Sequence, residues 1–83
     1  MTAFDNIPKA KAIWSLVLPA FTPPDDPTFH RWMYLFSIED FETACLRLCR
    51  WSGSSGRLHK TLKALMYDLR AERQQKQKQG GKQ

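Results

Sequence analysis

The chain has 83 residues, of which 42% are apolar and 12% aromatic, and a formal net charge of +5. This length limits it to one small domain, and the density of large apolar side chains excludes a fully disordered chain. All of the excess positive charge lies in residues 57–83, where Asp68 and Glu72 are the only acids. This asymmetry points to an anionic partner, with improved solubility as the alternative explanation.

A first helix is predicted between two prolines. It begins near Asp5 or Asn6, either of which can cap it, with Pro8 in the first turn. It ends before Pro19, because proline disfavours helical geometry in the residue that precedes it. Apolar residues cover more than half of its circumference, so we expect it to be central: Ile13, Trp14, Leu16, Val17 and Leu18.

A second helix is predicted after the turn-rich segment PAFTPPDDP. Asp26 followed by Pro27 is a helix-start signal, and the helix covers residues 27–36. Its core residues recur at helical spacing: Phe29, Trp32, Met33 and Phe36.

A third helix is predicted from the cap Ser37 to about Arg50. Asp40 stands where a capping box usually has Glu, and negative charge in a first turn favours the helix. One face of this helix is apolar: Phe41, Ala44, Cys45, Leu48 and Trp51.

The segment SGSSG at 52–56 ends the third helix and starts a fourth. A leucine stripe tied to the domain is formed by Leu58, Leu62, Leu65 and Leu69, with Lys60, Lys63, Tyr67 and Arg70 on the opposite side. After Glu72 the apolar pattern stops. We therefore expect an all-α, compact bundle of four short helices over residues 1–72, and a flexible, basic Gln/Lys tail over 73–83.

The beginning of the chain, MTAFDNIPKAK, does not combine a basic segment with an apolar one, so we expect no signal peptide. The apolar run AIWSLVLPAF is far shorter than the roughly 20 residues that a membrane span needs. Only two cysteines occur. We expect a cytoplasmic protein with reduced cysteines and no membrane contact.

Enzyme signatures are missing. Cys45 or Cys49 could pair with His30 or His59 as a nucleophile and its base, but the spacing singles out no such pair. A structural zinc site needs a second ligand pair beside the two cysteines, which the single, distant histidines do not provide. We expect no enzymatic activity, no metal and no cofactor.

Nucleic-acid binding is the chemistry that the basic end favours. Cations along one helix face can neutralise phosphates, and a tyrosine among them can stack on an exposed base. The segment SGSSG is longer than the usual turn of a helix-turn-helix motif, so base-specific recognition is not expected. The candidate binding residues are Arg57, Lys60, Lys63, Tyr67, Arg70, Arg73, Lys76 and Lys78.

The segments WSLVLPAF at 14–21, FHRW at 29–32 and FSIEDFETA at 36–44 resemble small helical modules of replication proteins. These are the DnaD-like primosome proteins and phage helicase loaders of bacteria. Of the tyrosine and tryptophan typical of the last DnaD-like helix, only Tyr67 is present. The resemblance implies a replication-accessory protein, with residues 57–83 contacting single-stranded DNA or a replication protein.

The alternative is a protein-interaction module, such as a phage or plasmid modulator of a host protein, or a homodimer. In that case the leucine stripe and exposed parts of Trp14, Trp32 or Trp51 would form the contact surface. The basic tail would then serve solubility.

Overall fold

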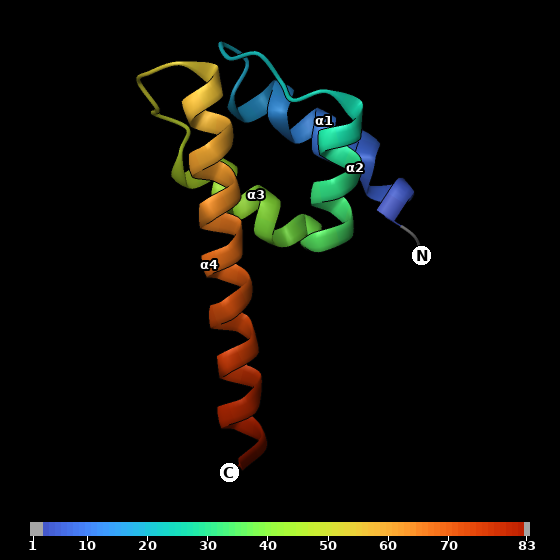
Figure 1. The fold of residues 1–83 in the computed structure, drawn as a ribbon, viewed down its shortest axis with the longest axis vertical. Helices are drawn as coiled ribbons and strands as arrows, with labels where there is room; N and C mark the ends of the chain where they lie inside the picture. Colours follow the sequence, from blue (N-terminus) through green and yellow to red (C-terminus); the bar gives the residue numbers. More distant parts are fainter. Residues whose placement is uncertain (1–2, 83) are drawn as a thin grey trace.

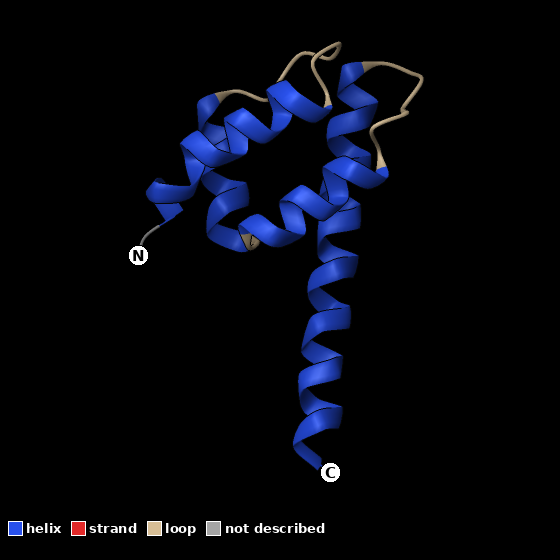
Figure 2. Cartoon of the chain, turned by 180° about the vertical axis from the view of Figure 1, so that it is seen from behind, coloured by secondary structure: helices blue, strands red, loops and turns tan. Residues whose placement is uncertain are grey.

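The computed structural model describes the backbone of residues 3–82 and the side chains of residues 6–75. Four helices follow in chain order: α1 (Ala3–Val17), α2 (Asp26–Leu35), α3 (Ile38–Arg47) and α4 (Ser55–Lys82). The described backbone contains no strand, which confirms the all-α fold (Figure 2). Helix α1 packs on α2 and α3, and α4 packs on α3, so that the four helices enclose one core (Figure 1).

Helix α1 starts earlier than its sequence pattern predicts. It begins at Ala3, so Asp5 and Asn6 lie within the helix and Pro8 is internal. A proline at this point removes one helical hydrogen bond. Burial of Ile7 and Ala10 on either side of it favours the helical conformation despite that loss.

Side-chain caps fix the starts of α2 and α3. The carboxylate of Asp25, rather than of Asp26, accepts a hydrogen bond from the backbone N–H of Thr28 at 3.1 Å. Hydrogen bonds from the side chain and backbone of Thr28 lower the pKa of Asp25. Ser37 caps α3 as predicted, and its Oγ accepts from the N–H of Asp40 at 3.1 Å. Helix α3 then ends at Arg47, ahead of the predicted end near Arg50.

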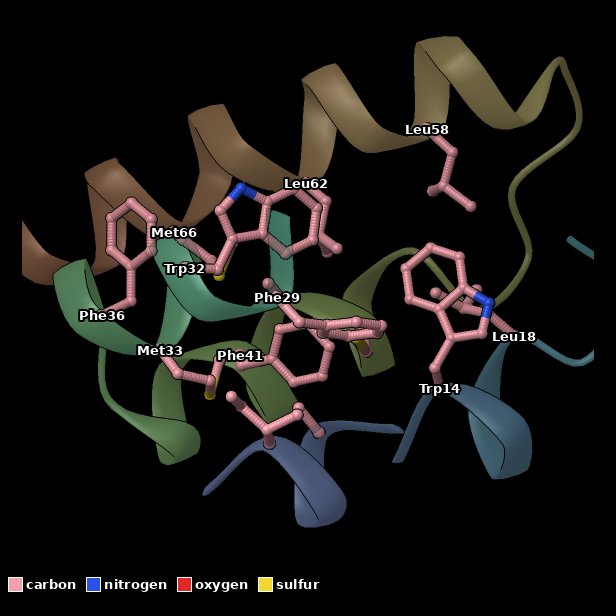
Figure 3. Packing of buried hydrophobic residues seen from close by; sticks show 14 residues of the cluster. Trp14, Leu18, Phe29, Trp32, Met33, Phe36, Phe41, Leu58, Leu62 and Met66 are labelled. Atoms are coloured by element: carbon pink, nitrogen blue, oxygen red, sulfur yellow. The ribbon is translucent and has the colours of Figure 1, made fainter. Parts of the chain in front are cut away.

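Aromatic side chains from α2 and α3 form the centre of the core. The rings of Phe29 and Phe41 meet edge to face at 6.2 Å between centroids, and the ring of Trp32 lies 6.2 Å from that of Phe41. Helix α1 contributes Trp14, and Leu18 follows directly after the helix; both side chains are almost fully buried. Figure 3 shows α4 covering this cluster with Leu58, Leu62 and Met66, all three completely buried.

The buried stripe of α4 therefore differs in part from the predicted leucine stripe. Met66 takes a central place, while Leu65 and Leu69 lie at the margin and are only partly buried. The spacing of four between Leu58, Leu62 and Met66 keeps one line of contact on the aromatic cluster.

The first turns of α4 also hold the loop between α1 and α2. The backbone N–H of Thr22 donates to the Oγ of Ser55 at 3.0 Å. The carbonyl oxygen of Thr22 lies 2.8 Å from the Nε2 of His59 and accepts a hydrogen bond from it. The imidazole also meets the ring of Trp14 edge to face at 5.4 Å. Two side chains one helical turn apart thus fix α4 against the loop.

Helix α4 is much longer than predicted and extends beyond the other three helices (Figure 1). It runs to Lys82, past the predicted helix end near Glu72. The division into a domain over 1–72 and a tail over 73–83 stays a prediction. Within the described residues, none of the helices is both long enough and apolar enough to cross a membrane.

The core assignment predicts a strong difference between two leucines. Leu62→Ala should lower the free energy of unfolding by about 3 kcal/mol, because it leaves a cavity beneath α4. Leu16→Ala is the matched control, since Leu16 is 81% exposed and its loss should change stability by less than about 0.5 kcal/mol. Urea unfolding followed by circular dichroism measures both. Equal losses would contradict the packing of α4.

Candidate nucleic-acid interface

Helix α4 begins at a serine cap that sets the direction of its first side chains. The Oγ of Ser54 accepts a hydrogen bond from the backbone N–H of Arg57 at 3.2 Å, and its carbonyl accepts from Leu58 at 3.1 Å. Because Leu58 points into the core, Arg57 and Lys60 point away from it. The segment 52–56 thus starts α4 through the cap Ser54, as its sequence predicts, but it does not end α3, which already stops at Arg47.

Three of the predicted basic binding residues are exposed to solvent on α4. Arg57, Lys60 and Lys63 are all exposed. The ion pairs within residues 6–75 join Lys11 to Asp26 and Arg73 to Asp40, so none of these three is neutralised by a carboxylate there. They remain able to contact an external anion.

Two further exposed arginines, which the prediction omitted, precede α4. Arg47 lies in the last turn of α3, where positive charge favours the helix, and Arg50 lies in the following turn. The sequence contains no Asp or Glu between Glu42 and Asp68. We call the exposed cations around the start of α4 the basic corner; it consists of Arg50, Arg57, Lys60 and Lys63. Arg47 lies apart from them, in a hollow that it lines together with Asp40, Leu69 and Glu72. The stretch without Asp or Glu can be read from the sequence. It extends over parts of two helices and the loop between them, so a search for basic residues along one helix misses it.

Tyr67 and Arg70 are engaged with the end of α2. The Nη1 of Arg70 donates to the carbonyl oxygen of Leu35 at 3.1 Å. Its guanidinium lies 5.3 Å from the centre of the Tyr67 ring and 5.7 Å from that of Phe36. The Tyr67 ring in turn meets Phe36 edge to face at 4.8 Å. Long side chains on the flank of α4 thus reach back to the domain, although helical spacing places them opposite the core.

Arg73 is bound to the start of α3. Its Nη2 donates to the Oδ1 of Asp40 at 2.5 Å and to the Oγ of Ser37 at 2.9 Å. Asp40 is only 6% exposed, and its Oδ2 is buried without a hydrogen-bond partner among the described residues. Asp40 therefore anchors Arg73 instead of completing the predicted capping box.

Lys76 and Lys78 complete the predicted set. Both belong to α4, but their side chains lie outside the residues whose side chains the structure describes.

The residues considered for catalysis give no support to a nucleophilic site. Burial, with a smaller effect from the charge of Glu42, raises the pKa of the Cys45 thiol to about 12, so it carries little thiolate at neutral pH. Cys49 is exposed, and His59 is occupied by the carbonyl of Thr22. The described residues contain no group of three or more side chains able to hold a metal ion.

Comparison with known proteins returns no match to any protein-family model, any curated protein sequence or any solved structure. The resemblance to DnaD-like and helicase-loader modules thus stays a prediction.

The ion pair between Arg73 and Asp40 predicts that substitutions of these two residues have non-additive effects on stability. Arg73→Ala should lower the free energy of unfolding by about 2 kcal/mol, because it strands a buried carboxylate. In an Asp40→Asn background, Arg73→Ala should lower the free energy of unfolding by less than about half as much. The amide carries no charge that would be left buried and unpaired.

Urea unfolding of the two single variants and the double variant measures this coupling. Arg57→Ala is the control, and should change stability by no more than about 0.5 kcal/mol. Additive losses in the double variant would contradict the anchoring contact.

Proposed function

We propose that this protein is a small, non-enzymatic nucleic-acid-binding protein of the cytoplasm that assists DNA replication. Its basic corner and α4 contact phosphates without reading bases. The observation that carries the proposal is the exposure of Arg57, Lys60 and Lys63, with no carboxylate paired to them in the described region. Exposed, unpaired cations favour binding to a polyanion, because each contact with a phosphate releases condensed counterions.

Other basic residues of α4 bind groups within the domain, and this contrast supports phosphate binding by the exposed ones. Arg70 and Arg73 bind Leu35, Ser37 and Asp40, and so contribute to the stability of the domain. The side chains of Arg57, Lys60 and Lys63 make no such hydrogen bond or ion pair within residues 6–75, so the fold itself does not need their charge.

The projecting end of α4 adds a second basic element. No acid follows Glu72 in the sequence, whereas Lys76, Lys78 and Lys82 do follow it. Carried on a helix that extends past the globule, this charge can attract a nucleic acid over roughly a Debye length, about 8–10 Å at physiological salt (Figure 1).

Neutralising two exposed lysines should weaken nucleic-acid binding and its salt dependence together. For Lys60→Gln/Lys63→Gln, the slope of log K against log salt should fall in magnitude by about 1.5, as each lost phosphate contact contributes about 0.7–0.9. Lys9→Gln/Lys11→Gln on α1 is the matched control and should leave the slope unchanged. Fluorescence anisotropy with a labelled oligonucleotide measures this between 20 and about 200 mM salt.

The projecting end is tested in the same titration by ending the chain after Gln75. This truncation keeps Arg73 on Asp40, whereas a cut after Arg70 would also destabilise the domain. No binding of the full chain at low salt, or an affinity independent of salt, would refute the proposed function.

A protein contact is the second candidate, on a different surface from the one predicted. Of the predicted contact residues, Leu58, Leu62, Trp14 and Trp32 are buried in the core, while Leu65, Leu69 and Trp51 are only partly buried. By contrast, Leu16 on α1 is 81% exposed and Leu46 on α3 is 55% exposed. A homodimer built on these leucines should dissociate on Leu16→Ser/Leu46→Ser substitution, which light scattering measures as a halved mass. A monomeric mass for the unmodified chain would exclude the homodimer.

A further inference from the structure

Trp51 occupies a distinctive place at the turn between α3 and α4. Its indole Nε1 donates to the carbonyl oxygen of Ser54 at 3.2 Å, which ties the ring to the residue that caps α4. A Cβ on Gly53 would lie 3.1 Å from the indole nitrogen, so the glycine lets the backbone pass close to the ring. The indole is thereby held in one position by its own loop.

The three tryptophans of the chain differ in accessibility. Trp14 and Trp32 are 2% and 3% exposed and belong to the core. Trp51 is only partly buried and packs at the margin of the core. Trp51 is therefore the one tryptophan among the three with appreciable solvent exposure, and its indole is hydrogen-bonded to its own loop.

Positive charge surrounds this indole on both sides along the chain. Arg50 precedes it directly, and Arg57 donates its backbone N–H to Ser54, the same residue that accepts the indole hydrogen bond. Both arginine side chains are exposed, and the acid-free run from 43 to 67 includes all of these residues. An aromatic ring is thus set within the basic corner.

We propose that Trp51 stacks on an unpaired base, and that the ligand of the basic corner is single-stranded nucleic acid, with Arg50 and Arg57 on the flanking phosphates. This inference rests on the proposed function and narrows its ligand. Base–aromatic stacking combined with a basic surface is the chemistry of sequence-tolerant single-strand binding. In a duplex the faces of the bases are covered by their neighbours, so the indole has no base face to contact.

Trp51 takes over the stacking role that the sequence assigned to Tyr67. Tyr67 is 39% exposed, but the Arg70 guanidinium lies over its ring at 5.3 Å and the ring also meets Phe36 edge to face. The hydrogen bond to Ser54 restricts the indole of Trp51 before binding, which reduces the entropic cost of stacking.

The burial of Trp14 and Trp32 makes intrinsic fluorescence a direct test. The full chain is titrated at low salt with oligothymidylate and oligouridylate of about 12 nucleotides, and with a duplex of the same length. We expect both single strands to quench the emission and to bind at least about tenfold more tightly than the duplex.

Three variants separate stacking from packing. Trp51→Leu should weaken single-strand binding by roughly tenfold, and Trp51→Phe, which keeps an aromatic face, by less than about threefold with loss of the quenching. Tyr34→Leu is the matched control, because Tyr34 is 81% exposed on α2, outside the basic corner, and its loss should change neither quantity. Circular dichroism establishes that each variant is folded.

Equal affinity for duplex and single strand, or binding without quenching, would overturn the role of Trp51 and leave the proposed function standing. An equal loss from Tyr34→Leu would likewise overturn it. No binding of any of the oligonucleotides would overturn both.

Discussion

Burial of one side of α4 against the aromatic cluster is the constraint on which the rest of this structure depends. In so small a domain, Leu58, Leu62 and Met66 are the side chains by which α4 closes the core over Trp32 and Phe41. Their burial fixes the rotation of the helix about its axis. The position of every other side chain around α4 follows from its spacing to Leu58, Leu62 and Met66. Core packing therefore determines which basic residues are exposed to solvent.

That rotation divides the basic residues of α4 into two groups with different physical roles. Arg70 and Arg73 lie where they reach the junction of α2 and α3, and they bind Leu35, Ser37 and Asp40. A buried carboxylate such as Asp40 is costly unless it is paired, so Arg73 is needed by the domain itself. Arg57 and Lys60, nearer the start of the helix, have no carboxylate to meet in the described region and remain available to a ligand.

The turn between α3 and α4 adds a further cation and an aromatic ring to the basic corner. It brings Arg50 and a fixed, partly exposed Trp51 next to the first turn of α4. Phosphates and bases require different side chains, and the turn supplies both kinds at one place. A long helix that continues past the globule extends the positive charge in one direction (Figure 1).

Local sequence signals were sufficient for the existence of the four helices and for the cap of α3, because a cap such as Ser37 and the spacing of Phe29, Trp32 and Phe36 depend on neighbouring residues alone. They misplaced the start of α1 and the cap of α2, which is Asp25. The same spacing identified Leu58 and Leu62 as core. It could not show that Met66 would replace Leu69 in the centre, since this depends on the shape of the cluster opposite. Likewise, Asp40 looks like a cap and Arg73 like a free cation until α3 and α4 are packed together. Charge pairing between residues far apart in the chain is settled only when the core has fixed the helices in space.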